Sequence, residues 1–184
     1  QKYMSQTANR IIRKTICADS SVNRIYAVSD GMGGHENGEV ASFMVVDAVK
    51  HFVARHQAKA FTKTHDKFNY IQEFQQMIHQ TNLNILDCSA NTCETDTMGS
   101  TLSGIVLFSD EAVTFNIGDS STFLYVDGAL RKLTVDDNEA ERFRDVDAAA
   151  LEANGTRLTK HFGMAKSSGM LTARVSPPIS LKAG

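Results

Sequence analysis

The sequence has few cysteines, no excess of charge of one sign and no long apolar run. Its three cysteines, Cys17, Cys88 and Cys93, are odd in number, and the last two do not have the spacing of a zinc-binding pair. Reduced thiols are therefore expected rather than a disulfide framework or a zinc site, which points to the cytoplasm.

Charge and hydropathy argue against two further classes of protein. Nineteen Lys and Arg residues against 21 Asp and Glu residues give a formal charge of -2 over 184 residues, so no basic excess attracts nucleic acid. No stretch approaches the roughly 20 consecutive apolar residues that a bilayer span needs, and the start lacks a secretory signal pattern. We therefore expect a single domain, residues 1–184, that binds neither nucleic acid nor membrane and is a monomer.

Periodicity predicts two long helices after a pair of strands. Residues 10–18 and 25–30 have the β-branched content of strands around a polar turn, which suggests a hairpin. Apolar residues recur three and four apart in residues 38–57 and again in 67–90, so both segments are expected to be helices that pack together against a sheet. The apolar positions are Val40, Ala41, Phe43, Met44, Val45, Ala48, Val49, Phe52 and Val53 in the first, and Phe68, Ile71, Phe74, Ile78, Ile85 and Leu86 in the second.

From Ser100 onward the pattern becomes extended. Four strands are expected, at residues 101–108, 112–117, 122–126 and 129–133, and the Asp-Gly pair between the last two favours a tight hairpin. We predict an antiparallel meander of four strands. Strands, then helices, then a run of strands is the α+β pattern.

The remaining sequence has weaker patterns. Residues 136–138 offer helix N-cap chemistry before a weak apolar stripe, which Gly155 can end. A further strand is expected at residues 171–175.

One acidic side chain stands in an unusual loop. Asp30 follows an apolar strand, Gly31, Gly33 and Gly34 let the backbone approach a ligand closely, and a helix begins soon afterwards. Such a loop can hold a cation through Asp30 and a backbone carbonyl, with space for a phosphate beside it. A plain strand-to-helix turn has the same local pattern.

A second acid, Asp119, also stands at a strand end, beside Gly118. Alone, it is typical of a hairpin turn in which the side chain caps the backbone. Together with Asp30 it suggests a metal site, because Mg²⁺ and Mn²⁺ take oxygen ligands that converge from different parts of a fold.

Several sequence blocks occur together in a recognisable order. They are Ala-Val-Ser-Asp-Gly-Met-Gly-Gly-His at 27–35 with Gly-Glu-Val-Ala-Ser at 38–42, Met-Gly-Ser-Thr at 98–101, Gly-Asp-Ser at 118–120, Leu-Thr-Val-Asp at 133–136, and Leu-Thr-Lys at 158–160 with Gly163. In this order and spacing the sequence resembles the metal-dependent protein serine/threonine phosphatases of type 2C, most closely the bacterial form.

The resemblance implies a four-layer α-β-β-α fold, an antiparallel β-sandwich flanked by helices, with metal ions at one end. In that family the residue matching Asp30 bridges two Mn²⁺ or Mg²⁺ ions, the carbonyl matching Gly31 binds one of them, and the residue matching Asp119 helps to hold a third. The residue matching His35 lies near the substrate phosphate, so Asp30 and His35 are the expected catalytic residues. Residues 136–158 correspond to a flap beside the site.

The implied reaction is hydrolysis of phosphoserine and phosphothreonine on proteins by a metal-bridging hydroxide. The implied partners are phosphorylated proteins and a cognate serine/threonine kinase.

The sequence also departs from the family. Ser121 stands where Arg is usual and Asp137 where His is usual, which puts the ion pairs around that turn in question. Further acids of the family would precede Gln1 and follow Gly184, so we expect an excerpt of a longer chain. The excerpt alone is expected to bind metal weakly or to be inactive, since one bridging carboxylate cannot offset the dehydration of two dications.

Two other interpretations stay open. A pseudophosphatase would keep the fold as a binding or regulatory module without a complete metal site. A nucleotide-binding regulatory domain would be stabilised by nucleotide without a divalent ion, although the glycine loop lacks the Gly-Lys-Ser/Thr of a P-loop.

Overall fold

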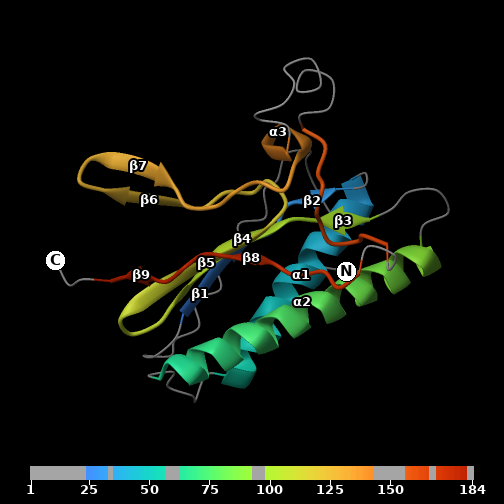
Figure 1. Ribbon diagram of the computed structural model, residues 1–184. Coiled ribbons are helices and arrows are strands. Elements are labelled where there is room, and N and C mark those ends of the chain that lie inside the picture. The colour runs from blue at the N-terminus through green and yellow to red at the C-terminus, as the bar shows by residue number, and fades with distance from the viewer. Residues whose placement is uncertain are drawn as a thin grey trace.

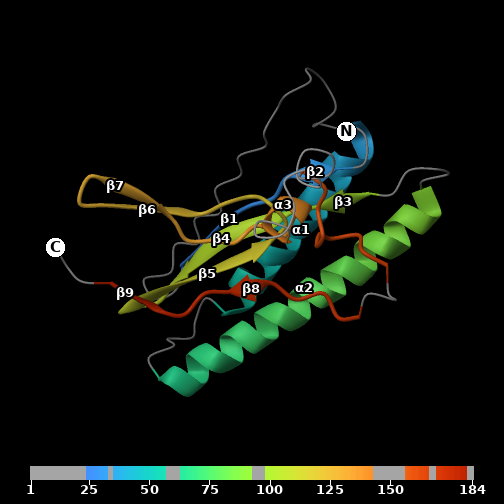
Figure 2. The same cartoon turned by 45° about the horizontal axis from the view of Figure 1, so that its top comes forward.

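The computed structural model describes residues 24–32, 35–56, 63–92, 98–142, 156–165 and 169–181. At its centre is an antiparallel sheet with two long helices against one face (Figures 1 and 2). The predicted α+β class, with antiparallel sheets flanked by helices, is confirmed. Of the four predicted layers, this part of the chain shows the helix layer and the sheet that packs on it.

The central sheet has five strands. They are β1 (Arg24–Val28), β4 (Leu102–Leu107), β5 (Glu111–Ile117), β8 (Arg174–Val175) and β9 (Ile179–Ser180). β4 lies between β1 and β5, and the other edge of β5 pairs with β8 near one end and with β9 near the other. The predicted strand at residues 171–175 is therefore real but shorter, and the predicted strand at 10–18 lies outside the described residues.

The expected meander is wrong in one respect. β6 (Phe123–Val126) and β7 (Ala129–Lys132) form a separate two-stranded sheet that extends away from the central one (Figure 1). β8 and β9 occupy the edge of β5 that β6 was expected to join. The predicted tight turn is confirmed, because Asp127 and Gly128 both have positive φ, at 51° and 78°, as a type I′ hairpin requires.

The helices α1 (His35–His56) and α2 (Thr64–Thr92) confirm the two predicted helical segments. Their buried faces meet the sheet in one aromatic cluster. The Phe74 ring of α2 is fully buried and lies 5.3 Å from the Phe52 ring of α1 and 4.8 Å from the Phe115 ring of β5, measured between centroids. This cluster fixes both helices on the sheet.

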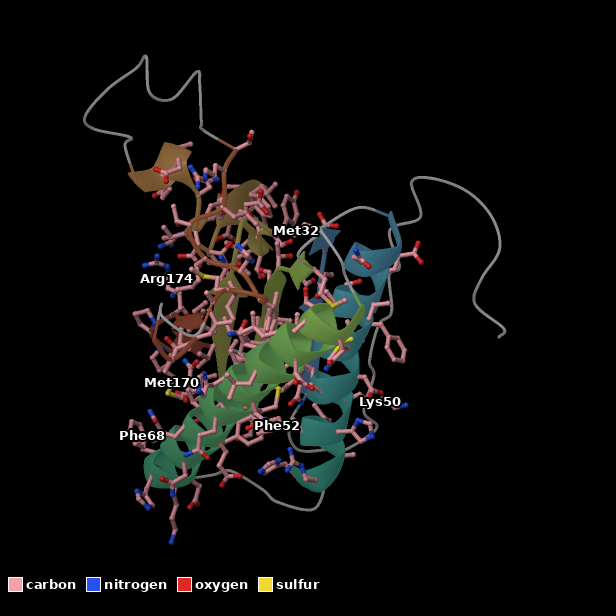
Figure 3. All side chains as sticks on the ribbon, turned by 90° about the vertical axis from the view of Figure 1, so that its right-hand side faces the viewer. Met32, Lys50, Phe52, Phe68, Met170 and Arg174 are labelled. Atoms are coloured by element: carbon pink, nitrogen blue, oxygen red, sulfur yellow. The ribbon has the colours of Figure 1, made fainter. Side chains whose placement is uncertain are left out.

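Not every apolar residue in the predicted helical stripes is buried. Phe43 and Phe68 are each 59% exposed. Tyr70, two residues after Phe68, is buried. Two residues correspond to a rotation of about 200° around the helix, so Phe68 faces solvent. In Figure 3 it stands at the outer end of α2, whereas Phe52 lies near the contact between the helices.

An ion-pair cluster joins the first turn of α2 to the turn between β4 and β5. The Lys67 ammonium lies 2.7 Å from an Asp110 carboxylate oxygen and 3.2 Å from a Glu111 oxygen. The hydrogen bond to Asp110 raises the pKa of Lys67 and lowers the pKa of the Asp110 carboxyl. α2 is thereby anchored at one end independently of the apolar core.

The two ends of the predicted flap lie side by side. Asn138 caps the short helix α3 (Glu139–Arg142) by accepting a hydrogen bond from the Glu141 N–H at 2.8 Å, as the predicted N-cap chemistry requires. Asn138 also forms a β-bridge with Leu158. Residues 143–155, the rest of the segment, lie outside the described part.

Among the described helices, none has a stretch that is both long enough and apolar enough to traverse a lipid bilayer.

Candidate metal centre

A cavity of about 490 Å³ lies at one end of the central sheet. Its walls are formed by Asp30, Gly31, Met32, Thr101, Asp119, Thr156, Arg157, Leu158 and His161. The cavity therefore brings together the three metal ligands that the resemblance implies, Asp30, Gly31 and Asp119, from positions almost 90 residues apart.

Strand direction explains why the two acids meet. β1 and β5 are both antiparallel to β4, so they run in the same direction, and their carboxyl ends lie at the same end of the sheet. Asp30 comes two residues after the end of β1, and Asp119 comes two residues after the end of β5. The two acids that follow strands in the sequence therefore line the same cavity.

Thr101 connects the two acidic loops. Its Oγ1 accepts a hydrogen bond from the Asp30 N–H at 3.1 Å and forms a second hydrogen bond of 2.7 Å with Ser120 Oγ, next to Asp119. Its own N–H donates to the Asp30 carbonyl at 2.8 Å, and the Ser100 hydroxyl donates to the same carbonyl at 2.8 Å. The Asp30 backbone is thus held on both sides, independently of its carboxylate.

Close backbone contact holds the glycine loop against α1. Gly31 and Met32 form β2 (Gly31–Met32), which pairs with β3 (Gly99–Ser100). A Cβ on Gly31 would overlap the carbonyl of Gly38 in the first turn of α1. Only glycine fits at this contact, so the backbone at Gly31 lies directly against α1 beside the cavity.

The donor atoms fit a hard divalent cation in kind. Within the described residues, neither the Asp30 nor the Asp119 carboxylate has a protein hydrogen-bond or ion-pair partner, and both side chains are exposed at the cavity. Mg²⁺ and similar ions are often held by one or two carboxylates while they keep several waters. No group of three or more His, Cys, Asp or Glu side chains able to hold a metal occurs in that same part of the chain, so a full coordination shell needs other oxygen donors.

His35 is the first residue of α1, and its side chain lies outside the described part. Its predicted place near a substrate phosphate stays a prediction.

Sequence reasoning missed the part of the cavity wall that residues 156–158 and His161 form. Phe162 is buried and exchanges backbone hydrogen bonds with Ser100 of β3, at 2.8 and 3.3 Å. This pairing brings Arg157 and His161 to the cavity. The block around residue 158 matches the resemblance, but the contact with Ser100 spans 62 positions, and no local pattern in the sequence signals it.

The departures from the family now have a structural account. Asp137 is only 4% exposed, and one of its carboxylate oxygens accepts a hydrogen bond from Arg174 of β8 at 2.8 Å, the other from the Gly118 N–H at 3.3 Å. The Ser121 hydroxyl donates to Asp136 at 3.1 Å. The turn that carries Asp119 is therefore fixed to β8 by an ion pair of its own.

Comparison with known proteins adds to this geometry. A family model described as protein phosphatase 2C matches residues 11–153. The serine/threonine phosphatase Stp of Listeria monocytogenes (serotype 4b, strain F2365) is 32% identical over 112 residues, which is 61% of this chain and 42% of that protein. The chain thus spans less than half the length of this curated relative.

Solved structures show the same fold. A Mycobacterium tuberculosis serine/threonine phosphatase, PstP/Ppp, superposes with a TM-score of 0.67 at 22% identity, over 87% of this chain and 64% of that one. The catalytic domain of PstP in complex with two manganese ions superposes with a TM-score of 0.64 at 22% identity, over 92% of this chain and 70% of that one.

Proposed function

The chain belongs to the protein phosphatase 2C family, and we propose that the whole protein hydrolyses phosphoserine and phosphothreonine on other proteins, using Mn²⁺ or Mg²⁺. The observation that carries this proposal is that Asp30, Gly31 and Asp119 line the same cavity. The name of the Listeria relative, a serine/threonine phosphatase, supports the reaction class, and the manganese complex of PstP supports the ions.

In this proposal Asp30 and the Gly31 carbonyl hold two ions, and Asp119 contributes to a third. Such ions, when bound, would activate water for attack and would neutralise charge on the phosphoryl oxygens. The protein's own contribution is placement: Ser100 and Thr101 hold the Asp30 backbone at the cavity before metal or substrate arrives. His35 is proposed to contact the substrate phosphate.

Metal removal tests the reaction class. Phosphate release from a phosphothreonine peptide by the full-length protein is expected to fall to background after EDTA treatment and to return when Mn²⁺ is added in excess. A colorimetric phosphate assay measures both steps. Hydrolysis that persists unchanged in EDTA would rule out the metal-dependent reaction.

Thr101→Val tests the link between the two acidic loops. Valine keeps the volume but removes the oxygen that bonds Asp30 and Ser120, so we expect a loss of about 10- to 100-fold in Mn²⁺ affinity or activity, as for other groups that orient metal ligands. The Mn²⁺ concentration for half-maximal activity of the full-length protein is the measurement. Thr114→Val, at a buried threonine of β5, is the control and should leave that concentration unchanged.

A pseudophosphatase is the second candidate. The lack of a cluster of three potential ligands among the described residues is the observation in its favour. It predicts no Mn²⁺-dependent phosphate release from the full-length protein, so the EDTA experiment separates the two candidates. The cognate kinase, the monomeric state and the cytoplasmic location stay predictions.

A further inference from the structure

Arg157 stands in the cavity wall and, among the residues that the structure describes, has no partner for its charge. It lines the same cavity as Asp30 and Asp119, yet within the described residues its guanidinium makes no ion pair or hydrogen bond, with those acids or with any other group. The side chain is exposed. A guanidinium carries five N–H donors, and none of them bonds another described residue.

Other basic residues in this region are engaged. Lys132 lies 2.6 Å from an Asp136 oxygen, Arg174 lies 2.8 Å from Asp137, and Lys160 donates to the Thr172 carbonyl at 3.2 Å. Each of them bonds an acceptor that the fold provides. Arg157 thus differs from its basic neighbours in facing a cavity rather than a protein acceptor.

The backbone around Arg157 is held in place. The Arg157 carbonyl accepts a hydrogen bond from the Glu139 N–H at 2.9 Å, and the Thr159 N–H donates to the Asp137 carbonyl at 2.8 Å. Between them, Leu158 is bridged to Asn138. These contacts fix the Cα of Arg157 at the cavity, so a ligand need order only its side chain.

We propose that Arg157 binds the phosphoryl group of the substrate in the cavity that it lines together with Asp30 and Asp119. This inference rests on the proposed phosphatase function. The carboxylates of Asp30 and Asp119 favour cations. The Arg157 guanidinium, which has no partner among the described residues, favours an anion such as the phosphoryl group, which bound cations would also attract. Arginine is well matched to this task, because two parallel N–H donors can engage two phosphoryl oxygens at once. Arg157 then sets how tightly the phosphoryl group binds, without holding the metal.

The experiment compares three variants of the full-length protein. Arg157→Met removes the charge and the paired N–H donors, whereas Arg157→Lys keeps the charge alone. Arg131→Met removes an exposed arginine from β7, a strand that does not line the cavity. For each we would measure kcat and KM with a phosphothreonine peptide and with p-nitrophenyl phosphate, the inhibition constant of inorganic phosphate, and the Mn²⁺ concentration for half-maximal activity.

Arg157→Met is expected to raise KM and the phosphate inhibition constant about tenfold or more, as loss of a charge-assisted bidentate contact does. Arg157→Lys should restore part of this loss, Arg131→Met should match wild type, and the Mn²⁺ requirement should stay constant in all variants. Wild-type KM and phosphate inhibition in Arg157→Met would overturn the inference.

A wild-type protein without hydrolytic activity would reject the proposed function separately. Arg157 would then be judged by calorimetric binding of inorganic phosphate in the presence of Mn²⁺. Weaker binding by Arg157→Met supports the anion site, and equal affinity, or no phosphate binding by wild type, overturns it.

Discussion

Replacing Asp30 by asparagine in the full-length protein is expected to lower kcat for phosphopeptide hydrolysis by at least about 100-fold, the scale seen when one preorganised electrostatic group is lost from an active site. Asparagine keeps the shape of the side chain but removes its negative charge. The carboxylate has no described protein partner, whereas the Asp30 N–H and carbonyl are bonded to Thr101 and Ser100. The substitution should therefore spare the fold and affect cation binding directly.

Steady-state kinetics at several Mn²⁺ concentrations, together with the thermal unfolding midpoint, would measure this effect. Asp127→Asn is a matched control: Asp127 lies in the exposed β6–β7 turn with positive φ, a conformation that asparagine also adopts readily. It should leave kcat and the midpoint unchanged. An Asp30→Asn protein with wild-type, EDTA-sensitive activity would contradict the assignment of Asp30 to the metal.

Replacing Phe74 by alanine is expected to destabilise the full-length protein by about 3 to 5 kcal/mol, the usual cost of truncating a buried aromatic residue. Phe74 is fully buried and contacts the rings of Phe52 and Phe115, so it joins both helices to the sheet. The aromatic pairs cannot re-form across the cavity left behind. Since domains are commonly stable by about 5 to 15 kcal/mol, this is a large share of the total.

Urea unfolding followed by circular dichroism measures the change. Phe68→Ala provides the control on the same helix, because Phe68 is mostly exposed and its removal should cost within about 0.5 kcal/mol. Equal losses for the two variants would show that the core does not depend on the Phe74 cluster.

Much of this arrangement is predictable because its signals are local. The helical period in residues 35–56 and 64–92 is carried by side chains three and four positions apart. The Asp127-Gly128 turn follows from the ability of these two residues to adopt positive φ. Asp30 and Asp119 can be singled out because each follows an apolar strand, and the family resemblance then implies a shared role in metal binding.

The same local pattern misplaced particular residues. Phe68 matched the apolar stripe of its helix in composition, but the buried face passes through Tyr70 and Phe74, and rotation around the helix turns Phe68 outward. The β6–β7 hairpin was recognised, whereas its separation from β5 was not. That separation reflects β8 and β9, which occupy the free edge of β5 and lie more than 50 residues after β5 in the chain.

The amino-acid order by itself determined the helices, the strand ends, the hairpin turn and the two acids that follow strands, Asp30 and Asp119, since each depends on residues within a few positions of one another. Only the tertiary structure decided which other residues line the cavity with those acids. Arg157 and His161 reach the cavity because Phe162 pairs with Ser100, and the Asp119 turn is held because Asp137 meets Arg174 of β8. Contacts across such distances are set by packing and strand pairing of the whole sheet, which no short segment encodes.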